Sequence, residues 1–270
     1  MSALVLTLKE EPQAPLDLSC LVPDHLASLS LEQIRALPLR SGNSLLRTGE
    51  LFSVSGTPGE EIILPTGSRN ILFVGAFMTR GVLHVEGNVG SYAGCGMRGG
   101  TLRVRGQAGD FAASGMTGGL LIIEKDCGDF LAAARPGDAH GMGGGTAIVL
   151  GSAGARIAHR MRRGQVLVGG NAGVYCAARM LAGTVMVLGS CAAHLGFAMQ
   201  RGTLILSSTP LVSESFADCG LNEFTFLRLM ARDFASRGVD LAAFSPRSFR
   251  ARRWVGDFRT GGAGEILLPS

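Results

Sequence analysis

The sequence lacks the short motifs that most often identify an enzyme. It contains no GxSxG, no HExxH and no Walker loop. GxGxxG-like strings occur, but they carry little information in a chain with 40 glycines. No two of the five histidines have a metal-binding spacing: His25, His84, His140, His159 and His194. We therefore expect this chain to contribute no catalytic residue, no cofactor site and no metal site of its own.

Cysteine pairs of the CxxC type are also absent. Without them a zinc centre is not indicated, and free thiols in a reducing cytoplasm fit better than disulfides. The six cysteines are Cys20, Cys95, Cys127, Cys176, Cys191 and Cys219.

A signal peptide is missing too, because the N-terminus carries Lys9, Glu10 and Glu11 and has no apolar h-region. Residues 180–200 carry no formal charge and are long enough to span a bilayer. The repeat described below continues through them, however, which favours burial in the protein. We expect a cytoplasmic protein that does not enter a membrane.

Lysine is nearly missing, since only Lys9 and Lys125 accompany 23 arginines. Arginine binds carboxylates and phosphates through a bidentate fork, so subunit interfaces or an anionic ligand are indicated. The coding bias of a GC-rich genome explains the skew equally well. The net charge is only +4, and the basic, aromatic stretch 245–259 matches no nucleic-acid recognition motif. We expect this tail to pack against another polypeptide and the protein to bind no nucleic acid.

One pattern recurs seven times between residues 78 and 202. Each turn ends with a glycine that lies three residues after a methionine. The glycines are Gly81, Gly100, Gly119, Gly145, Gly164, Gly183 and Gly202, and the methionines are Met78, Met97, Met116, Met142, Met161, Met180 and Met199. Successive glycines are 19 residues apart, except for one step of 26 that contains a seven-residue insertion. A fixed short period is typical of a solenoid, in which one repeat cannot bury its apolar face alone.

Apolar residues follow each anchoring glycine at alternate positions, as Leu102 and Val104 do after Gly100. Alternation with a period of two predicts a half-buried strand. Nineteen residues are too few for a strand plus a substantial helix. They suit one coil of a parallel β-helix, in which equivalent side chains stack about 4.8 Å apart. The sequence therefore predicts an all-β fold, a parallel β-helix of about seven coils.

The methionines share their register with ordinary core residues. We expect them to form an inward repeat core that fills irregular space beside the leucine and valine positions. A soft-metal site or a promiscuous docking surface is the alternative interpretation of such a stripe.

The predicted organisation is one structural unit in three parts. Residues 1–50 form an N-terminal cap, in which residues 3–8 are a strand and a capping box of Ser30 and Gln33 opens a helix that ends near Pro38. Residues 51–210 hold the repeats: short strands at 51–55 and 62–64 come first, and the seven regular coils begin near Ile71 and run to about residue 208.

Residues 211–270 form a C-terminal part. Its apolar residues at helical spacing predict a helix over Asn222–Ser236 with Gly238 at its C-cap. We expect this capping helix to cover the far end of the column, followed by the basic tail.

Two sets of polar residues are weaker candidates for chemistry. Asp110 and Asp129 each lie in a Gly-Asp-Phe turn, 19 residues apart, so they should stack and could act as an acid/base pair. Capping of their own turns is the plainer explanation. The insertion, residues 134–140, carries Asp138 and His140, which are ligands or a base in one interpretation and ordinary surface or interface residues in the other.

Positive charge is concentrated just before Gly164. The residues are Arg156, His159, Arg160, Arg162, Arg163 and, one coil later, Arg179. Arg179 falls in register with Arg160, and stacked like charges about 5 Å apart repel each other. A counter-anion is therefore expected nearby, as carboxylates of a neighbouring subunit or as an anionic ligand.

The repeat unit G-x-x-M-x-x-G-x-[IL]-x-[IV]-x-G is complete at Gly94–Gly106. Its opening position is small, with glycine at Gly75, Gly94 and Gly196 and alanine at Ala113, Ala139, Ala158 and Ala177. Over about residues 50–208 this unit resembles the repeat of the family formed by the C subunits of formylmethanofuran dehydrogenase and, more distantly, the glycine-repeat β-helix of glutamate synthase. The tail, with Trp254–Asp257 and Gly264–Leu267, is similar to the ending of that first family. The resemblance implies a right-handed β-helix.

Two members of the family compete as the source of the resemblance. One is the C subunit of the bacterial formyltransferase/hydrolase complex, which takes the formyl group of formyl-tetrahydromethanopterin through a methanofuran-type carrier to formate in formaldehyde oxidation. The other is the C subunit of a tungsten or molybdenum formylmethanofuran dehydrogenase of methanogens. The arginine bias favours the bacterial complex and a methylotroph.

Either resemblance implies a non-catalytic scaffold subunit. The chemistry would reside in amidohydrolase-like, formyltransferase and dehydrogenase-like sibling subunits, with zinc in a sibling and no cofactor in this chain. The rival of another class is a stand-alone enzyme, a hexapeptide-type acyltransferase or a β-helical carbohydrate enzyme. The 19-residue period and the methionine register argue against the acyltransferase.

Overall fold

A computed structural model of the chain describes residues 3–239 and 250–270. The first half contains β1 (Leu4–Leu8), β2 (Leu16–Asp17), α1 (Pro23–Leu26), α2 (Leu31–Ala36), β3 (Pro38–Ser41), β4 (Ser44–Arg47), α3 (Thr48–Leu51), β5 (Phe52–Ser55), β6 (Glu61–Leu64), β7 (Ile71–Leu72), β8 (Val82–Val85), β9 (Thr101–Val104) and β10 (Leu120–Ile123). The second half contains β11 (Gly143–Val149), β12 (Arg163–Val168), β13 (Thr184–Val187), β14 (Arg201–Leu206), β15 (Ala217–Glu223), α4 (Phe226–Ser236), β16 (Arg250–Gly256), the 3-10 turn Phe258–Thr260 and β17 (Ala263–Pro269). The protein is strand-rich with little helix, as an all-β class requires.

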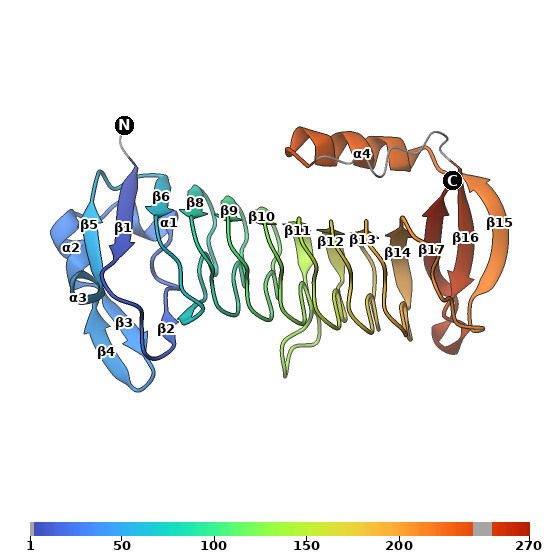
Figure 1. Cartoon of the computed structure of the whole chain (residues 1–270), viewed down its shortest axis with the longest axis horizontal. Coiled ribbons are helices and arrows are strands. Elements are labelled where there is room, and N and C mark those ends of the chain that lie inside the picture. The colour runs from blue at the N-terminus through green and yellow to red at the C-terminus, as the bar shows by residue number, and fades with distance from the viewer. Residues whose placement is uncertain (1–2, 240–249) are drawn as a thin grey trace.

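The strands form one long sheet of 13 members and a small sheet of four. The long sheet has the order β15-β16-β17-β14-β13-β12-β11-β10-β9-β8-β6-β1-β5 and runs the length of the molecule (Figure 1). From β6 to β14 all neighbours are parallel, and Leu83 pairs with Leu102, which pairs with Leu121. Isolated bridges such as Ala153 to Ala172 join successive repeats on a second side. The 19-residue period is therefore the distance between hydrogen-bonded neighbours.

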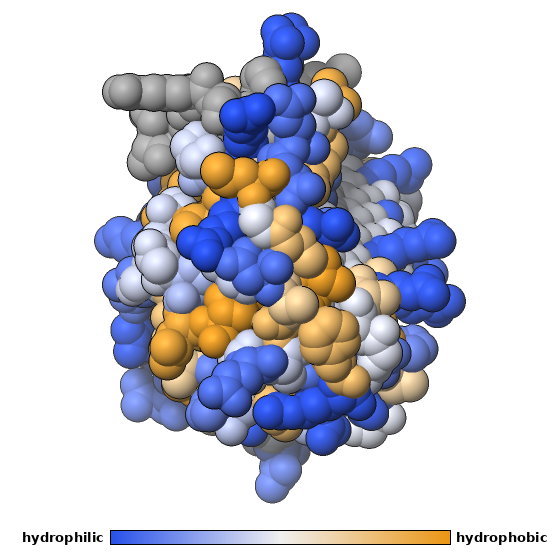
Figure 2. Space-filling view, turned by 90° about the vertical axis from the view of Figure 1, so that its right-hand side faces the viewer, coloured by the Kyte–Doolittle hydropathy of each residue, from blue (hydrophilic) through white to orange (hydrophobic). Residues whose placement is uncertain are grey.

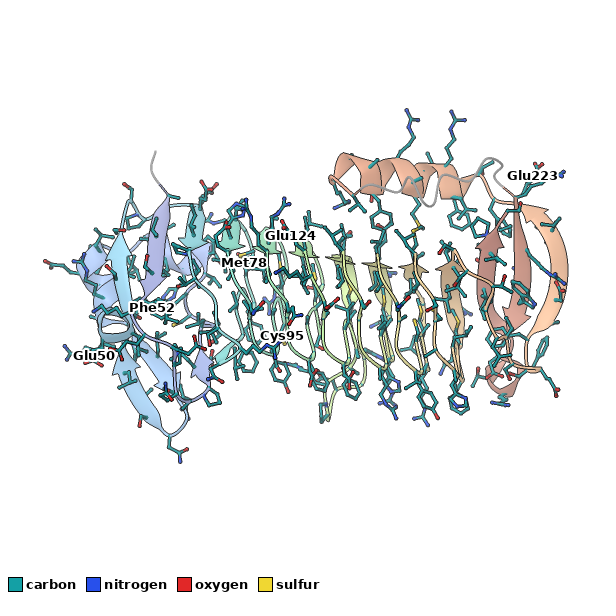
Figure 3. The ribbon with its side chains drawn as sticks, viewed as in Figure 1. Glu50, Phe52, Met78, Cys95, Glu124 and Glu223 are labelled. Carbon is teal, nitrogen blue, oxygen red and sulfur yellow. The ribbon has the colours of Figure 1, made fainter. Side chains whose placement is uncertain are left out.

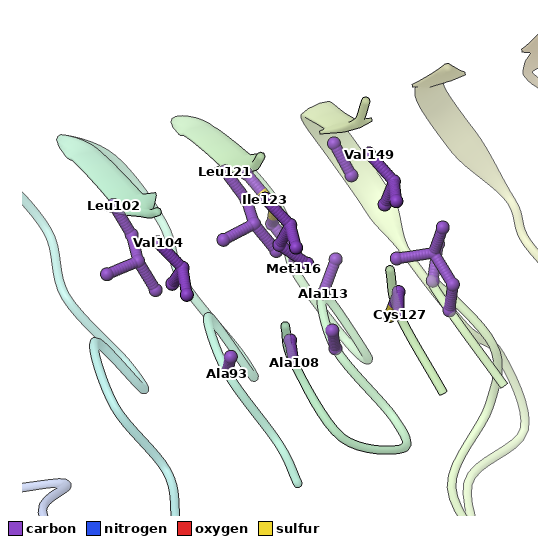
Figure 4. Close-up of a cluster of buried hydrophobic side chains, with 14 of the residues drawn as sticks. Ala93, Leu102, Val104, Ala108, Ala113, Met116, Leu121, Ile123, Cys127 and Val149 are labelled. Atoms are coloured by element: carbon purple, nitrogen blue, oxygen red, sulfur yellow. The ribbon is translucent and has the colours of Figure 1, made fainter. Parts of the chain in front are cut away.

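The interior is a column of equivalent side chains. Figure 4 shows branched side chains of the strands on one side and small side chains of the returning segments on the other. The former include Leu102, Val104, Leu121 and Ile123, the latter Ala93, Ala108 and Cys127, and all are buried. All seven methionines are 0% exposed and belong to the same core.

Each methionine packs against the glycine of the following repeat. A Cβ built on Gly119 would lie 2.7 Å from Met97 Cε and 2.8 Å from the Gly100 carbonyl oxygen. A Cβ built on any of the anchoring glycines after Gly81 would lie 2.7–2.9 Å from the Cε atom of the preceding repeat's methionine, and all of these glycines have positive φ. The M-x-x-G register thus has a steric cause, because the methionine of one repeat occupies the space that a side chain on the next glycine would need.

The seven-residue insertion shifts one assignment made from the sequence. Alignment on the methionine put Ala139 at the small opening position of its repeat, but the structure has Ala132 there. Ala132 has φ 58°, like Ala113 and Ala158, and its N–H bonds to the Ala112 carbonyl at 2.7 Å. The insertion lies between this position and Met142, so counting back three residues from the methionine gives Ala139, seven residues after the true opening position.

The strand predicted at residues 3–8 and the capping box of the first predicted helix are confirmed. Ser30 Oγ accepts the Gln33 N–H, and the Gln33 side chain accepts the Ser30 N–H, so the capping box opens α2 as expected. The parallel ladder begins earlier than expected, because β6 already pairs with β8 and β1 with β6.

The C-terminal helix differs from its prediction in extent and position. Residues 217–223 form strand β15, so α4 begins at Phe226 and not at Asn222. The helix lies along the outer face of the sheet over β11–β14 (Figure 1) and not over the end of the column. Leu227, Met230 and Phe234 pack there on outward apolar side chains. These are Ile122, Ile148, Leu167, Met186 and Ile205.

The far end of the column is closed by strands. β17 pairs with β14 in parallel, and β16 and β15 follow antiparallel. This end shows apolar patches between polar ones (Figure 2), and Leu211, Leu221 and Phe258 are 83%, 63% and 59% exposed. The described part of the basic tail, Arg250–Arg259, pairs within this chain, since Arg252 contacts Asp218 and Arg253 contacts Glu265 at 3.0 Å. Residues 245–249 of the tail lie outside the described residues.

The packing of methionine on glycine predicts a large cost for Gly119→Ala. Gly119 has φ +86° and is crowded, whereas Gly137 has φ +88° and no atom within 4 Å of the place that a Cβ would take. Positive φ alone costs an alanine about 1 kcal/mol, and overpacking adds about 1–3 kcal/mol. Urea unfolding should show a loss of about 3 kcal/mol for Gly119→Ala and about 1 kcal/mol for Gly137→Ala. Equal losses would contradict the steric explanation.

Candidate functional site

The arginine-rich bends of three successive repeats enclose a pocket of about 290 Å³. It is lined by Arg156, His159, Tyr175, Ala178, Arg179 and Phe197, which we call the arginine pocket. Three of the six positive candidates from the sequence are thus brought together. Arg160 lies next to the pocket, where its backbone N–H bonds to the Ala178 carbonyl at 3.3 Å. Arg162 and Arg163 are exposed at the start of β12 and do not line it.

Arg156 occupies a place that aromatic residues fill in the other repeats. Phe73, Tyr92, Phe111 and Phe130 stack with ring centroids 4.6, 5.3 and 4.6 Å apart. Arg156 follows in the same column. The stack then resumes with Tyr175 and His194 at 4.8 Å. The sequence signal for this column was an aromatic residue every 19 positions, and it was missed.

The guanidinium of Arg156 lies between two rings, 5.9 Å from the Phe130 centroid and 5.1 Å from the Tyr175 centroid. Phe130, Arg156 and Tyr175 share positive φ values of 62°, 60° and 61°. The backbone therefore does not change where arginine replaces an aromatic residue. The exchange places a cation on the surface with its position set by ring contacts.

Positive charge in the arginine pocket is not balanced locally. In residues 3–239 and 250–270, none of Arg156, Arg160 and Arg179 forms an ion pair with a carboxylate. Burial, and then the charges of these three arginines, lower the pKa of His159. Its Nδ1 atom is buried without a hydrogen-bond partner among the described residues. The site is thus arranged to receive negative charge or a hydrogen-bonding group.

Asp110 and Asp129 stack as expected, but both carboxylates bond backbone. Asp110 Oδ1 accepts the Asp129 N–H at 2.8 Å, and Asp129 Oδ1 accepts the Ala155 N–H at 2.7 Å. Each therefore ties its turn to the next repeat and does not cap its own turn. The neighbouring column, three positions before that of Asp110 and Asp129 in the repeat, makes the same kind of bond with an amide, since Asn171 Oδ1 accepts the Ser190 N–H at 2.9 Å. Since a neutral amide can serve, these contacts favour a structural role.

The insertion is held by its own ion pair. Arg135 Nε lies 2.6 Å from Asp138 Oδ2, and Arg135 Nη1 donates to Cys95 Sγ at 3.4 Å. Asp138 is therefore engaged within the loop, while His140 is exposed. In the described part of the chain, no three His, Cys, Asp or Glu side chains are grouped so that they could hold a metal ion. None of its helices is long and apolar enough to cross a membrane, and all six cysteines are free.

Asp257, at the end of the Trp254–Asp257 motif, has a structural position. Its side chain is 1% exposed and accepts the N–H groups of Ala198 and Arg259, both at 3.0 Å. Burial alone would raise the pKa of Asp257, but these N–H donors, the Ser215 side chain and the Arg259 charge hold it below its usual value. The motif thus fastens the β16–β17 connection to the last repeat.

Comparison with known proteins identifies relatives of this chain. The GXGXG motif family model matches residues 84–213. The C subunit of the tungsten-containing formylmethanofuran dehydrogenase 2 of Methanothermobacter wolfeii is 36% identical over 101 residues, which are 36% of this chain and 37% of that protein. The C subunit of the molybdenum-containing enzyme 1 of Methanothermobacter thermautotrophicus is 33% identical over 93 residues, which are 34% and 23% of the two chains. The matches thus span 37% of the first relative and 23% of the second.

A solved structure matches over the whole length. It is a chain of the formyltransferase/hydrolase complex (FhcABCD) from Methylorubrum extorquens, crystallised with methylofuran. The TM-score is 0.89 at 34% identity, and the alignment covers 98% of this chain and 99% of that one.

The interrupted aromatic column predicts that Arg156→Phe stabilises the isolated chain. Phenylalanine adopts the required φ at positions 73, 111 and 130, and a stacked aromatic pair contributes about 0.5–1.5 kcal/mol beyond its burial. We expect urea unfolding to show a gain of about 1 kcal/mol. The reverse change, Phe111→Arg, should lose a similar amount. A loss with Arg156→Phe would show that the arginine itself stabilises the column.

The position of Asp257 predicts an acid-dependent contribution to stability. Because its folded pKa is lowered, the contribution is complete above the unfolded value of about 3.9 and is lost as the pH falls through the folded value. Asp257→Asn should cost about 2 kcal/mol at pH 7 and flatten the decline of unfolding free energy below about pH 4. Asp218→Asn, which affects an exposed ion pair with Arg252 and an exposed hydrogen bond from the Gly220 N–H, should change the unfolding free energy little. An unchanged acid profile in Asp257→Asn would refute this role.

Proposed function

Because this chain belongs to the GXGXG-motif family and, within it, to the homologues of the formylmethanofuran dehydrogenase C subunit, we propose that it is a non-catalytic scaffold subunit of a formyltransferase/hydrolase complex. The complex would take the formyl group of formyl-tetrahydromethanopterin through a methanofuran-type carrier to formate, in bacterial formaldehyde oxidation. One observation carries this proposal, the full-length match to a chain of such a complex at TM-score 0.89 and 34% identity.

The second candidate is the C subunit of a tungsten or molybdenum formylmethanofuran dehydrogenase. The 36% identity over 101 residues favours it. The bacterial complex is the better choice, because its chain matches from end to end whereas the dehydrogenase subunits match over a part.

The proposal implies sibling subunits that hold the chemistry. We expect amidohydrolase-like, formyltransferase and dehydrogenase-like partners in the cytoplasm of a methylotroph, with zinc in a sibling and the carrier shared by the complex. The chain would be one structural unit, a right-handed parallel β-helix at residues 51–210 between a cap at 1–50 and a C-terminal part at 211–270. The parallel pairing of residues one period apart supports this architecture.

In this proposal the arginine pocket is the surface through which the scaffold binds a sibling subunit or the formyl carrier. Arg156 and Arg179, with Arg160 beside them, lack ion pairs within the described residues. A surface of three cations is expensive to keep unless an anion approaches it. Carboxylates of a sibling subunit are the expected anions, and the polyanionic tail of the formyl carrier is the alternative. Arg162 and Arg163 would add exposed charge beside this contact.

The rival interpretation, a stand-alone enzyme, makes a different prediction for the purified protein. Native mass spectrometry of the tagged chain, purified from its native host, should show an assembly with formyltransferase and amidohydrolase siblings, while the chain alone turns over no formyl substrate. A homo-oligomer of this chain that has activity by itself would overturn the proposal. Tungsten or molybdenum in the purified assembly would instead assign this chain to a formylmethanofuran dehydrogenase.

The arginine pocket is tested by Arg156→Phe combined with Arg179→Gln. The double variant removes two cations but keeps the column packed, so the chain should fold while the assembly weakens about tenfold or more. Arg98→Gln removes an exposed arginine outside the pocket and should leave the assembly unchanged. Unchanged assembly and unchanged KM for the carrier in the double variant would exclude the pocket as this contact.

A further inference from the structure

The N-terminal part of the chain has the opposite charge to the rest. Residues 1–64 contain eight acidic and four basic residues, whereas residues 65–270 contain 13 acidic and 21 basic ones. Residues 1–64, the cap and the first strands after it, are therefore an acidic end on a basic protein. Charge that is segregated in this way steers partners of opposite sign to one end of a molecule.

A groove of about 400 Å³ opens in this acidic end. It lies between the segment that follows β1 and the elements β4 and α3, and its apolar lining includes Pro12, Leu16, Leu46 and Leu51. Pro12 and Leu16 are buried, and Leu46 and Leu51 are half-buried. We call this the cap groove. Its volume is at the lower end of the range of pockets that hold an inserted group.

Three exposed glutamates line the same groove: Glu10, Glu11 and Glu50. Glu50 projects from the outer side of the cap (Figure 3). Glu50 Oε2 accepts the Arg47 N–H at 3.0 Å, and Glu11 Oε1 accepts from Ser68 Oγ. Within the described residues none of the three forms an ion pair. The single lysine of the groove, Lys9, donates its ammonium to the Gly49 carbonyl at 2.6 Å.

We propose that the cap groove docks a segment of a sibling subunit that inserts an apolar side chain flanked by lysine or arginine. The apolar lining rewards burial of an aliphatic or aromatic side chain. The carboxylates at the rim match cations on both sides of such an anchor, which fixes its register. A complementary apolar and charged arrangement of this kind is typical of a protein segment. The inference rests on the proposed scaffold function and adds a second contact, of opposite sign to the arginine pocket.

Site-specific crosslinking in the native assembly tests the docking directly. The photoreactive residue p-benzoylphenylalanine replaces Gln13, an exposed residue of the groove, in the tagged chain expressed in its native host. After irradiation, mass spectrometry should find a crosslink to one sibling peptide that has lysine or arginine next to an apolar residue. The same photoreactive residue at Ser53, exposed on β5 outside the groove, should not give that crosslink. A crosslink to a second copy of this chain, to a peptide without a cation, or to no subunit would overturn the proposal.

Charge reversal tests the role of the glutamates. Glu10→Lys should lower the yield of the Gln13 crosslink about tenfold, because Glu10 is exposed and has no hydrogen bond or ion pair to lose within the described residues. Glu60→Lys, the same change at an exposed glutamate outside the groove, is the matched control and should keep the yield within about twofold. Equal yields in both variants would overturn the charge argument. If siblings are captured without a groove crosslink, this inference fails while the scaffold function stands; if no formyl-transfer sibling is captured at all, the scaffold function fails.

Discussion

The packing of a methionine against the glycine of the next repeat is the contact on which the rest of the structure depends. A side chain on Gly119 would lie 2.7 Å from the methyl group of Met97, so the two positions constrain each other across the repeat boundary. This contact recurs from Met78 to Gly202 and keeps neighbouring backbones in one register. Once the register holds, every position of a repeat stacks on its equivalent and the surface becomes a set of columns.

The columns explain how a repetitive chain can carry specific sites. A position that is aromatic in most repeats becomes Arg156 in one, and the rings of Phe130 and Tyr175 hold its guanidinium. On another side, Glu86 with Arg105 and Arg103 with Glu124 form ion pairs along the outer face of β8–β10. Where that face turns apolar, from Ile122 onward, α4 covers it. A departure from the repeat thus changes the chemistry of one column, and from Ile122 onward such a departure is where α4 packs on the sheet.

Much of the fold follows from the sequence because one period determines both pairing and burial. The 19-residue steps predicted that Leu102 pairs with Leu121, as the structure has it, and Ser30 with Gln33 predicted the start of α2. The position of α4 could not be read from its own periodicity, since that pattern shows only that one face is buried. The surface on which α4 packs does have a signal in the sequence, because Leu167, Met186 and Ile205 are apolar at the outward strand position where His84 and Arg103 are polar.

The candidate site was less predictable. The sequence located the arginines, but it could not show that Arg156 and Arg179 line one pocket while Arg162 and Arg163 do not. The direction of a side chain in these bends depends on the backbone conformation, and many non-glycine residues here have positive φ values, which the sequence does not predict. The aromatic column was missed because its members change between phenylalanine, tyrosine, histidine and arginine. The carboxylates of Asp110 and Asp129 were expected to stack, but the spacing does not show that their oxygens accept backbone N–H groups of the next repeat.

The central claim is that this chain acts through contacts and not through chemistry of its own. A cryo-electron microscopy map of the assembly purified from the native host tests it most directly. We expect carboxylates of a sibling subunit or of the carrier within hydrogen-bond distance of Arg156 and Arg179. Solvent on all sides of the arginine pocket in the intact assembly, or a substrate bound and turned over on this chain alone, would contradict it.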